Sequence, residues 1–462
     1  MRRALIGLTG ILALGACGDD EPRAALPDRD PFPSTYEPYP SDNFVLRGAT
    51  ILTGTGERID AGDVAVANGR IVRVGGVGAD VRGLREIDAT GMTITPGIID
   101  IHSHLGVYPS PGFASTADGN ESTNPNTAGV WAEHSVWPQD PGFTRALAGG
   151  VTAMQILPGS ANLFGGRSVT LKNVPGRTVQ EMKFPGAPYG MKMACGENPK
   201  RVYGDRGGPS TRMANFRGYR EGFEGAKQYA ASWKEYAANP EGKQPPARDL
   251  NKETIAAVLD GDILVHMHCY RGDEMAQVLD MAEEYGYEVS AFHHGVEAYK
   301  VADLLAERGV CGAVWADWWG FKLEAYDATL PNAALIAAQP NGCAIIHSDS
   351  ALGIQRLNQE AAKAMRDGRA IGLDIQPEDA ITWITANPAK AMGILGQTGT
   401  LEVGKMADIT VWDGDPFSVY TKAKLVFIDG ALMYDAGDPA ISPRTDFELA
   451  QRGLPGTGGA GQ

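Results

Sequence analysis

The sequence has no excess of basic residues. Its 41 Lys and Arg are outnumbered by 56 Asp and Glu, which gives a formal net charge of -15 at pH 7. Nucleic acids and anionic membrane surfaces bind to basic patches, and no Lys/Arg-rich run supplies one. We therefore expect neither as a partner. A small-molecule substrate fits this composition, and a homo-oligomer is compatible with it.

Long apolar runs are scarce as well, and the one at residues 4–14 is too short to cross a bilayer. Arg2 and Arg3 precede it, and Leu14-Gly15-Ala16-Cys17 follows it. Residues 1–17 resemble a bacterial lipoprotein signal peptide, in which Cys17 becomes the lipidated first residue. The alternative is an ordinary signal peptide cleaved near Ala16. Either one predicts export, and the first predicts a protein on the periplasmic face of a membrane, anchored only by lipid on Cys17.

Two further segments have little periodicity. Residues 18–44 are rich in Pro, Asp and Ser, which predicts a tether between the lipid and the folded body. The chain from residue 436 to 462 ends in Gly-rich sequence, which predicts a flexible tail.

Cysteine is rare, with five in 462 residues. Besides Cys17, an even number remains: Cys195, Cys269, Cys311 and Cys343. An even number in an exported protein invites disulfides, but all four lie in or beside apolar, strand-like runs without the spacing of a disulfide scaffold. We expect buried free thiols. A contact between Cys195 and Cys269 is the open alternative.

Both ends of the folded region have a β pattern. Short β-like runs at 45–52, 63–66 and 70–74 are separated by Gly, Asn and Asp, and similar runs return at 399–413 and 424–434. We predict that residues 45–95 and 398–435 together form one small β-sandwich domain.

The centre, residues 96–397, alternates short apolar strands with helical patterns, which favours a parallel α/β architecture. The candidate strands are 98–102, 151–157, 168–172, 190–195, 262–268, 288–293, 311–316 and 343–347. Eight strands predict a (β/α)8 TIM barrel, in which catalytic side chains come from the carboxyl ends of the strands.

Histidine is scarce too, but most of the eight are concentrated at these strand ends. In His102-Ser103-His104 the two imidazoles are two residues apart, so on an extended strand they point to the same side, as metal binding requires. Two polar residues at a strand end are the alternative. Other strands end similarly, at Lys192, His266, His268, His293, His294, His347 and Asp349. Packing alone does not explain this clustering.

These motifs resemble those of the amidohydrolase superfamily, specifically its imidazolonepropionase-like branch of metal-dependent hydrolases. The resemblance spans about residues 45–435. It rests on Pro96 to His104, Lys192-Met193-Ala194-Cys195-Gly196, His268-Cys269-Tyr270, His293-His294-Gly295, His347-Ser348-Asp349-Ser350 and Gly404-Lys405-Met406-Ala407-Asp408.

The resemblance implies a set of metal ligands, namely His102, His104, His268, His294 and Asp349, with carboxylated Lys192 bridging two divalent ions. A carbamate offers two anionic oxygens, whereas an ammonium would repel the ions. Two zinc ions suit this set, although iron, manganese or cobalt also fits. Lys172 competes as the bridging lysine, but Asn173 and Val174 match the motif poorly. His266 and His293 are alternatives to their neighbours, and we expect them to support the ligands instead.

The implied reaction is hydrolysis of an amide C–N bond by a metal-activated hydroxide. Asp349 would move the proton as general acid/base, and His347 would orient Asp349 or the substrate. Loops after the strands carry aromatic and cationic residues suited to a small, carboxylate-bearing substrate, and Tyr270, Arg271, Arg212 and Trp318 are the candidate substrate contacts. A dipeptidase or a cyclic amidase would fit.

Two other functions stay open. One is a mononuclear deaminase or imidazolonepropionase-type hydrolase, with His102, His104, His268 and Asp349 around one ion and His294 as catalytic base. The other is a non-catalytic lipoprotein that binds a ligand, which is disfavoured because no expected ligand position is missing.

Overall fold

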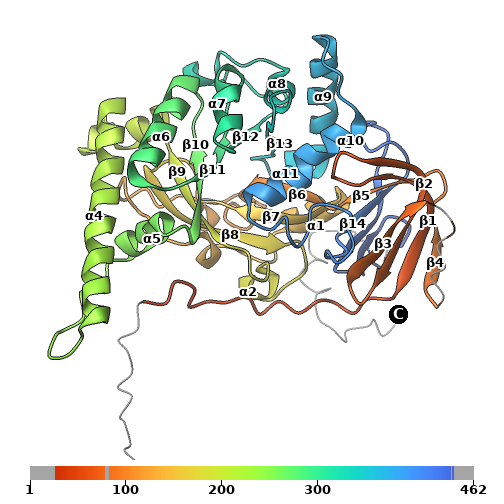
Figure 1. The fold of residues 1–462 in the computed structure, drawn as a ribbon, viewed down its shortest axis with the longest axis horizontal. Coiled ribbons are helices and arrows are strands. Elements are labelled where there is room, and N and C mark those ends of the chain that lie inside the picture. Colours follow the sequence, from red (N-terminus) through yellow and green to blue (C-terminus); the bar gives the residue numbers. More distant parts are fainter. Residues whose placement is uncertain (1–26, 77, 79–82, 439, 442–462) are drawn as a thin grey trace, which may run out of the picture.

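Eight strands in the middle of the chain form a nearly closed barrel (Figure 1). The computed structural model describes residues 27–76, 78, 83–438 and 440–441. The barrel strands, in their order around the sheet, are β6 (Ile98–Ser103), β7 (Val151–Ile156), β8 (Phe164–Lys172), β9 (Tyr189–Ala194), β10 (Ile263–His268), β11 (Val289–His293), β12 (Cys311–Val314) and β13 (Ala344–Ile346). The predicted barrel is thus confirmed.

One barrel strand, β8, runs against the others. It pairs antiparallel with both β7 and β9, whereas the other neighbouring strands in the sheet pair in parallel. The connection from β7 to β8, residues 157–163, is shorter than the roughly dozen residues that a parallel crossover needs. The carboxyl end of β8, with Lys172, therefore lies at the opposite end of the barrel from the carboxyl ends of the other strands.

The helices cover the outside of the barrel (Figure 1). They are α1 (Pro141–Ala148), α2 (Val179–Met182), α3 (Glu197–Tyr203), α4 (Arg212–Ala238), α5 (Leu250–Leu259), α6 (Gly272–Tyr285), α7 (Ala302–Glu307), α8 (Asn332–Ala337), α9 (Leu357–Ala370), α10 (Pro377–Ala380) and α11 (Ala386–Ala391). In α6, buried Met275, Val278, Leu279 and Ala282 recur at helical spacing, and Gly286 ends the helix in the left-handed conformation.

The barrel interior changes from apolar to polar along the strands. Ala153, Ala291, Ala313 and Ile345 belong to one buried apolar cluster. Two residues farther along the chain come Gln155 and His293 on their strands, and Trp315 and His347 directly after theirs. Because residues two apart share a face of a strand, the polar side chains form a layer nearer the carboxyl ends.

The two ends of the folded region form one β domain, as predicted. Its strands are β1 (Phe44–Leu52), β2 (Arg58–Ala67), β3 (Arg70–Gly76), β4 (Arg85–Asp88), β5 (Thr93–Pro96), β14 (Ile409–Trp412), β15 (Ala423–Ile428) and β16 (Ala431–Asp435). They form a single sheet that branches at β1, which pairs with β2, β4 and β5. The sheet curls around its own core, since Phe44 of β1 stacks on Phe427 of β15 with ring centroids 4.6 Å apart.

Residues 27–43, the described part of the expected tether, run beneath the barrel toward β1 (Figure 1). Arg29 forms ion pairs with Asp260 and Asp262, and Asp30 lies 2.9 Å from the ammonium of Lys183. This part of the segment is therefore bound to the barrel. The expected signal peptide, Cys17, residues 18–26 and residues 442–462 of the tail lie outside the described residues.

The expectation of free thiols is wrong, because the structure contains two disulfides, Cys195–Cys269 and Cys311–Cys343. Ala194 is level with His268 across β9 and β10, so the next residues, Cys195 and Cys269, also face each other. The second pair lies beside the register match of Gly312 with Ala344. Cα separations of 5.2 and 4.6 Å fall within the bonding range.

Candidate metal centre

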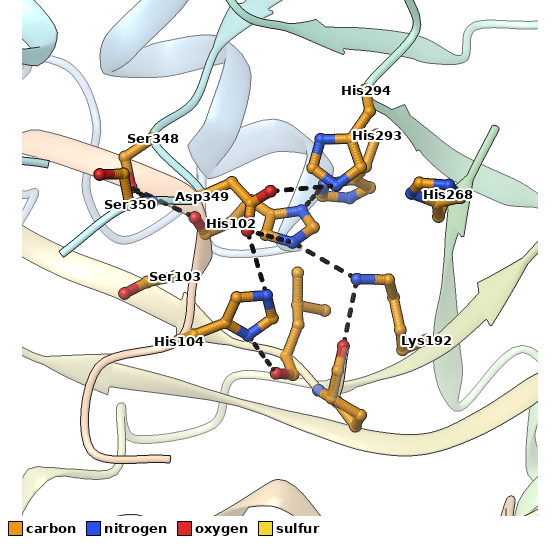
Figure 2. Close-up of polar contacts among 12 residues, drawn as sticks. His102, Ser103, His104, Lys192, His268, His293, His294, Ser348, Asp349 and Ser350 are labelled. Atoms are coloured by element: carbon orange, nitrogen blue, oxygen red, sulfur yellow. Dashed lines mark hydrogen bonds and ion pairs between the residues drawn. The ribbon is translucent and has the colours of Figure 1, made fainter. Parts of the chain in front are cut away.

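The site is built on His102 and His104 at the carboxyl end of β6 (Figure 2). Asp349, which follows β13, lies between them, with its Oδ1 atom 3.6 Å from Nε2 of His102 and 3.2 Å from Nε2 of His104. Its Oδ2 atom is 3.8 Å from Nε2 of His294, which follows β11. Three strand ends that are distant in the sequence thus converge on one carboxylate.

Two of these residues have an unusual backbone conformation. His294 has φ +59° and Asp349 has φ +48°, in the left-handed region that side chains other than glycine rarely occupy. Such strain persists only where the surrounding structure enforces it, and it is concentrated at functional sites. Here it lies at two of the residues predicted to bind metal.

Asp349 is ionised in this setting. Burial alone would raise its pKa, but the hydrogen bond from His104 and the electrostatic interactions with His104, His347 and Lys192 lower the pKa below its ordinary value. A carboxylate held in its charged form is available both as a metal ligand and as a proton acceptor.

Lys192 on β9 points into the same space (Figure 2). It is fully buried, and its Nζ atom lies 3.4 Å from Nε2 of His102 and 3.1 Å from the carbonyl oxygen of Pro158. Burial lowers the pKa of Lys192 to about 7, so much of it is a neutral amine near neutral pH. Lys172, the competing lysine, instead pairs with Asp408 and Asp429 at the other end of the barrel.

Several buried ring nitrogens at the site have no hydrogen-bond partner among the described residues. They are Nδ1 of His268, Nδ1 of His294 and both ring nitrogens of His347. Burial also lowers the pKa of His268 and His294 well below the ordinary value, which keeps them neutral as metal ligation requires. The unpartnered nitrogens therefore fit a metal centre.

The ligand atoms are also close enough together for metal binding. Those of His102, His104 and Asp349 lie within 4.8 Å of one another, as do those of His102, His294 and His347. His347, expected only as an orienting residue, thus lies among the potential ligands. A set of histidines and a carboxylate suits zinc.

Behind the ligands, His102 begins a row of buried histidines. Its Nδ1 atom lies 2.8 Å from Nδ1 of His293, whose Nε2 is 3.0 Å from Nδ1 of His266. Nε2 of His266 is in turn 3.1 Å from the side-chain amide of Gln155. Gly190 leaves room for this row, since a Cβ there would lie 2.6 Å from the His266 ring. His266 and His293 therefore support His102, as expected.

Asp100, which was not among the predicted site residues, joins the two sides of the site. It accepts hydrogen bonds from the backbone NH groups of His102 and Ser348, at 3.1 and 3.2 Å, and from the Ser348 hydroxyl. The backbone NH of Asp349 also bonds to the carbonyl oxygen of His102, at 2.9 Å. Asp100 thus ties β6 to the residues after β13. The position of Asp100 two residues before His102 is the sequence feature from which this role could have been predicted.

Among the candidate substrate contacts, Tyr270 and Trp318 lie near the centre. The Tyr270 ring is 4.5 Å from that of His268, and Trp318 stacks on Trp315, which itself stacks on His294 at 4.4 Å. Trp315, Trp318 and His294 contribute to the wall of a cavity of about 280 Å³.

Arg271 and Arg212 have carboxylate partners instead. Arg271 bonds to Asp273, with its Nη2 atom 2.7 Å from Oδ2. Arg212 pairs with buried Glu274, at 2.9 Å, and with Glu324. Their positive charges are therefore compensated within the protein.

The amidohydrolase family model matches residues 93–437. The chain belongs to the amidohydrolase family. Relatives in this family are named as amidohydrolases and deaminases, which are hydrolases that act on C–N bonds. Members of the family use divalent metals, often zinc, in keeping with the clustered ligand atoms.

Individual relatives support this membership. The chain is 34% identical over 375 residues to amidohydrolase tasK of Hapsidospora irregularis, a match that covers 77% of this chain and 37% of that protein. It thus spans little more than a third of that relative's length. A solved amidohydrolase from Thermotoga maritima MSB8 has 36% identity and a TM-score of 0.77, covering 85% of this chain and 100% of that one. A 5-methylthioadenosine/S-adenosylhomocysteine deaminase of Desulforudis audaxviator (strain MP104C) is 26% identical over 406 residues, covering 80% of this chain and 84% of that relative.

Proposed function

We propose that this amidohydrolase hydrolyses the amide bond of a small, carboxylate-bearing substrate at a centre of two divalent metal ions. The observation that carries the proposal is the convergence of His102, His104 and His294 on Asp349, with Lys192 beside them. His102, His104, His268, His294, Asp349 and carboxylated Lys192 would hold the ions, and zinc suits these ligands.

Carboxylation of Lys192 is chemically plausible in this position. The neutral amine adds to carbon dioxide, forming an N–C bond and releasing one proton, and leaves a carbamate with two anionic oxygens. Burial favours the neutral amine. The carbamate would place negative charge beside His102, whose Nε2 atom lies 3.4 Å from Nζ of Lys192.

The protein's own groups would then carry out the proton transfers. When bound, divalent ions lower the pKa of water and polarise a substrate carbonyl. Asp349, an ionised carboxylate in reach of three strand ends, accepts the proton of the attacking water and delivers it to the departing amine. Trp315 and Tyr270 flank His294 and help to exclude bulk water from the reacting atoms.

The test is an activity screen of the metal-loaded protein over dipeptides, N-acyl amino acids and hydantoin-like rings. Asp349→Asn keeps the shape of the side chain but removes the base, so we expect kcat to fall about 10²- to 10⁴-fold. Asp303→Asn, at an exposed position on α7, should leave kcat unchanged. Amide hydrolysis at wild-type rates by Asp349→Asn contradicts the proposal.

A mononuclear deaminase is the second candidate. It is favoured by the match to a relative named as a deaminase, which covers 84% of that relative, and by the group of His102, His104 and Asp349, whose ligand atoms could hold one ion. Release of ammonia with one metal equivalent per chain would establish it. A binding-only protein would give no turnover with any metal.

We further propose, from the sequence pattern of residues 1–17, that the protein is exported and lipidated on Cys17. Two disulfides support this, because they form and persist mainly outside the reducing cytosol. No helix among the described residues is long and apolar enough to cross a membrane. Metabolic labelling with palmitate should label the wild-type protein but not Cys17→Ser, and label in that variant overturns the proposal.

A further inference from the structure

Lys322, in the loop after β12, points its ammonium toward two neutral polar side chains. Its Nζ atom donates hydrogen bonds to Oδ1 of Asn198, at 2.7 Å, and to the hydroxyl oxygen of Tyr270, at 3.2 Å. An ammonium has three donors, so one remains for a further acceptor. The side chain is mostly buried, with 24% of its surface exposed.

The charge of Lys322 is less compensated than that of the two candidate arginines. The carboxylate it approaches, that of Glu197, is 3.9 Å away, whereas Arg212 and Arg271 bond to carboxylates at 2.9 and 2.7 Å. Burial lowers the pKa of Lys322; the charges of Glu197 and Asp349 oppose this shift, and that of Arg201 adds to it. An anion beside this ammonium would therefore be stabilised.

Lys322 is one side chain away from the metal centre. Asn198, which accepts its hydrogen bond, has its amide nitrogen 3.2 Å from Nε2 of His268. Tyr270 lies between Lys322 and the predicted ligands, with its ring 4.5 Å from that of His268 and 6.1 Å from that of His294. The Tyr270 oxygen accepts the hydrogen bond from Lys322, so its hydroxyl proton can be donated to an anion.

Aromatic contacts connect the surroundings of Lys322 with the tryptophan-lined cavity. Phe321, next to Lys322 in the chain, packs against both Trp315 and Tyr270, at 5.6 and 6.3 Å. The cavity of about 280 Å³ beside Trp315 and Trp318 is large enough for an aromatic side chain. His294 lines the cavity, and Tyr270, the hydrogen-bond partner of Lys322, has its ring 6.1 Å from that of His294, so His294 connects the cavity with the surroundings of Lys322.

We propose, building on the hydrolase function above, that Lys322 and the Tyr270 hydroxyl bind the substrate's carboxylate, while the cavity beside Trp315 and Trp318 receives an aromatic side chain. The substrate class is then a dipeptide or N-acyl amino acid whose carboxyl-terminal residue is aromatic. The carboxylate takes the third ammonium proton of Lys322 as a charge-assisted hydrogen bond. Lys322 replaces Arg212 and Arg271 as the carboxylate-binding cation.

The direct test is calorimetric binding of L-phenylalanine and of L-phenylalaninamide to the metal-loaded protein, because the two ligands differ only at the carboxyl group. We expect wild type to bind the acid about 10- to 100-fold more tightly than the amide. Lys322→Gln should reduce this ratio to near one, and Lys322→Arg should retain most of it. Lys300→Gln, which removes an exposed lysine paired with Glu297 and Asp327, should preserve it.

Three results overturn the inference: no preference for the acid in wild type, an unchanged ratio in Lys322→Gln, or an equal loss of both ligands, which would make Lys322 a structural support. Kinetics with L-alanyl-L-phenylalanine and its C-terminal amide provide a second readout. Lys322→Gln should raise KM for the acid alone. If wild type binds the acid preferentially but hydrolyses no amide, the proposed function fails while the carboxylate subsite stands.

Discussion

The Nδ1 atoms of His102 and His293 lie 2.8 Å apart, so one of the two must carry a proton and the other must accept it. When Nε2 of His102 binds a metal, the ring proton is on Nδ1 and is donated to His293. Nε2 of His293 lies 3.0 Å from Nδ1 of His266, so one of these two nitrogens must likewise carry a proton that the other accepts. Metal ligands are usually oriented by a carboxylate or a carbonyl, and here a neutral imidazole takes that place.

His293→Phe tests this support. Because the variant keeps the ring but removes the acceptor, we expect metal affinity, measured by competition with a chelator, to fall about 10- to 100-fold. His134→Phe alters a histidine outside the row, exposed beside Trp131, and should leave the affinity unchanged. Equal metal affinities in His293→Phe and wild type, with both proteins folded, would show that His293 does not support the metal centre.

The two disulfides should have different effects when they are removed. Cys195 and Cys269 come directly after β9 and β10, at the metal end of the barrel, and Cys269 is the residue after His268. Cys311 and Cys343 lie at the amino-terminal ends of β12 and β13, at the other end of the barrel. Replacing either pair with serine should lower the free energy of unfolding by about 2–5 kcal/mol. Only loss of the first pair should also weaken metal retention during dialysis. Equal metal retention in both double variants would show that the first bridge does not support the site.

Arg212 should matter for stability, since its removal leaves buried Glu274 and Glu324 without their cation. Arg212 is itself about one-third exposed, so we expect Arg212→Ala to cost only about 1–3 kcal/mol in urea unfolding. Arg220, on the same helix as Arg212, forms an exposed pair with Glu284 of α6, and Arg220→Ala should cost less than about 1 kcal/mol. A large rise in KM for Arg212→Ala without loss of stability would instead show that Arg212 binds the substrate.

Lys322 predicts a pH effect on substrate choice. Burial lowers its pKa below that of an ordinary lysine, with Glu197, Arg201 and Asp349 as the charged groups acting on it. As pH rises through that pKa the ammonium becomes neutral, so kcat/KM for L-alanyl-L-phenylalanine should fall relative to its amide. In the ratio of the two kcat/KM values, any titration that affects both substrates equally cancels.

In Lys322→Arg the guanidinium stays charged, and the fall in that ratio should move to higher pH. Identical profiles for wild type and Lys322→Arg would mean that another group controls the preference.

The sequence was sufficient to predict the barrel and the residues at its strand ends, because strand spacing and side-chain alternation are local properties. His102, His104 and Asp349 lie together as expected. The choice of Lys192 over Lys172 also agrees with the structure, and strand direction now explains it. β8 is antiparallel, so Lys172 lies at the far end with Asp408.

The features that were missed depend on contacts between distant segments. The disulfides require the register of β9 against β10, which the spacing of Cys195 and Cys269 does not reveal. Arg212 looked like a free cation because Glu274 and Glu324 are far from it in the sequence. Lys322 lies in a loop with the expected aromatic and cationic character but was not chosen as a substrate contact, since its role depends on Asn198 and Tyr270 from two other loops.

The central claim, a two-metal centre bridged by Lys192, is tested most directly by counting bound metal in purified wild type and Lys192→Ala by mass spectrometry. We predict two equivalents per chain in wild type, fewer than one in Lys192→Ala, and partial recovery in that variant when acetate replaces the missing carboxylate. Lys390→Ala, at an exposed position of α11, should keep two equivalents. Full metal content and full turnover in folded Lys192→Ala would contradict the account.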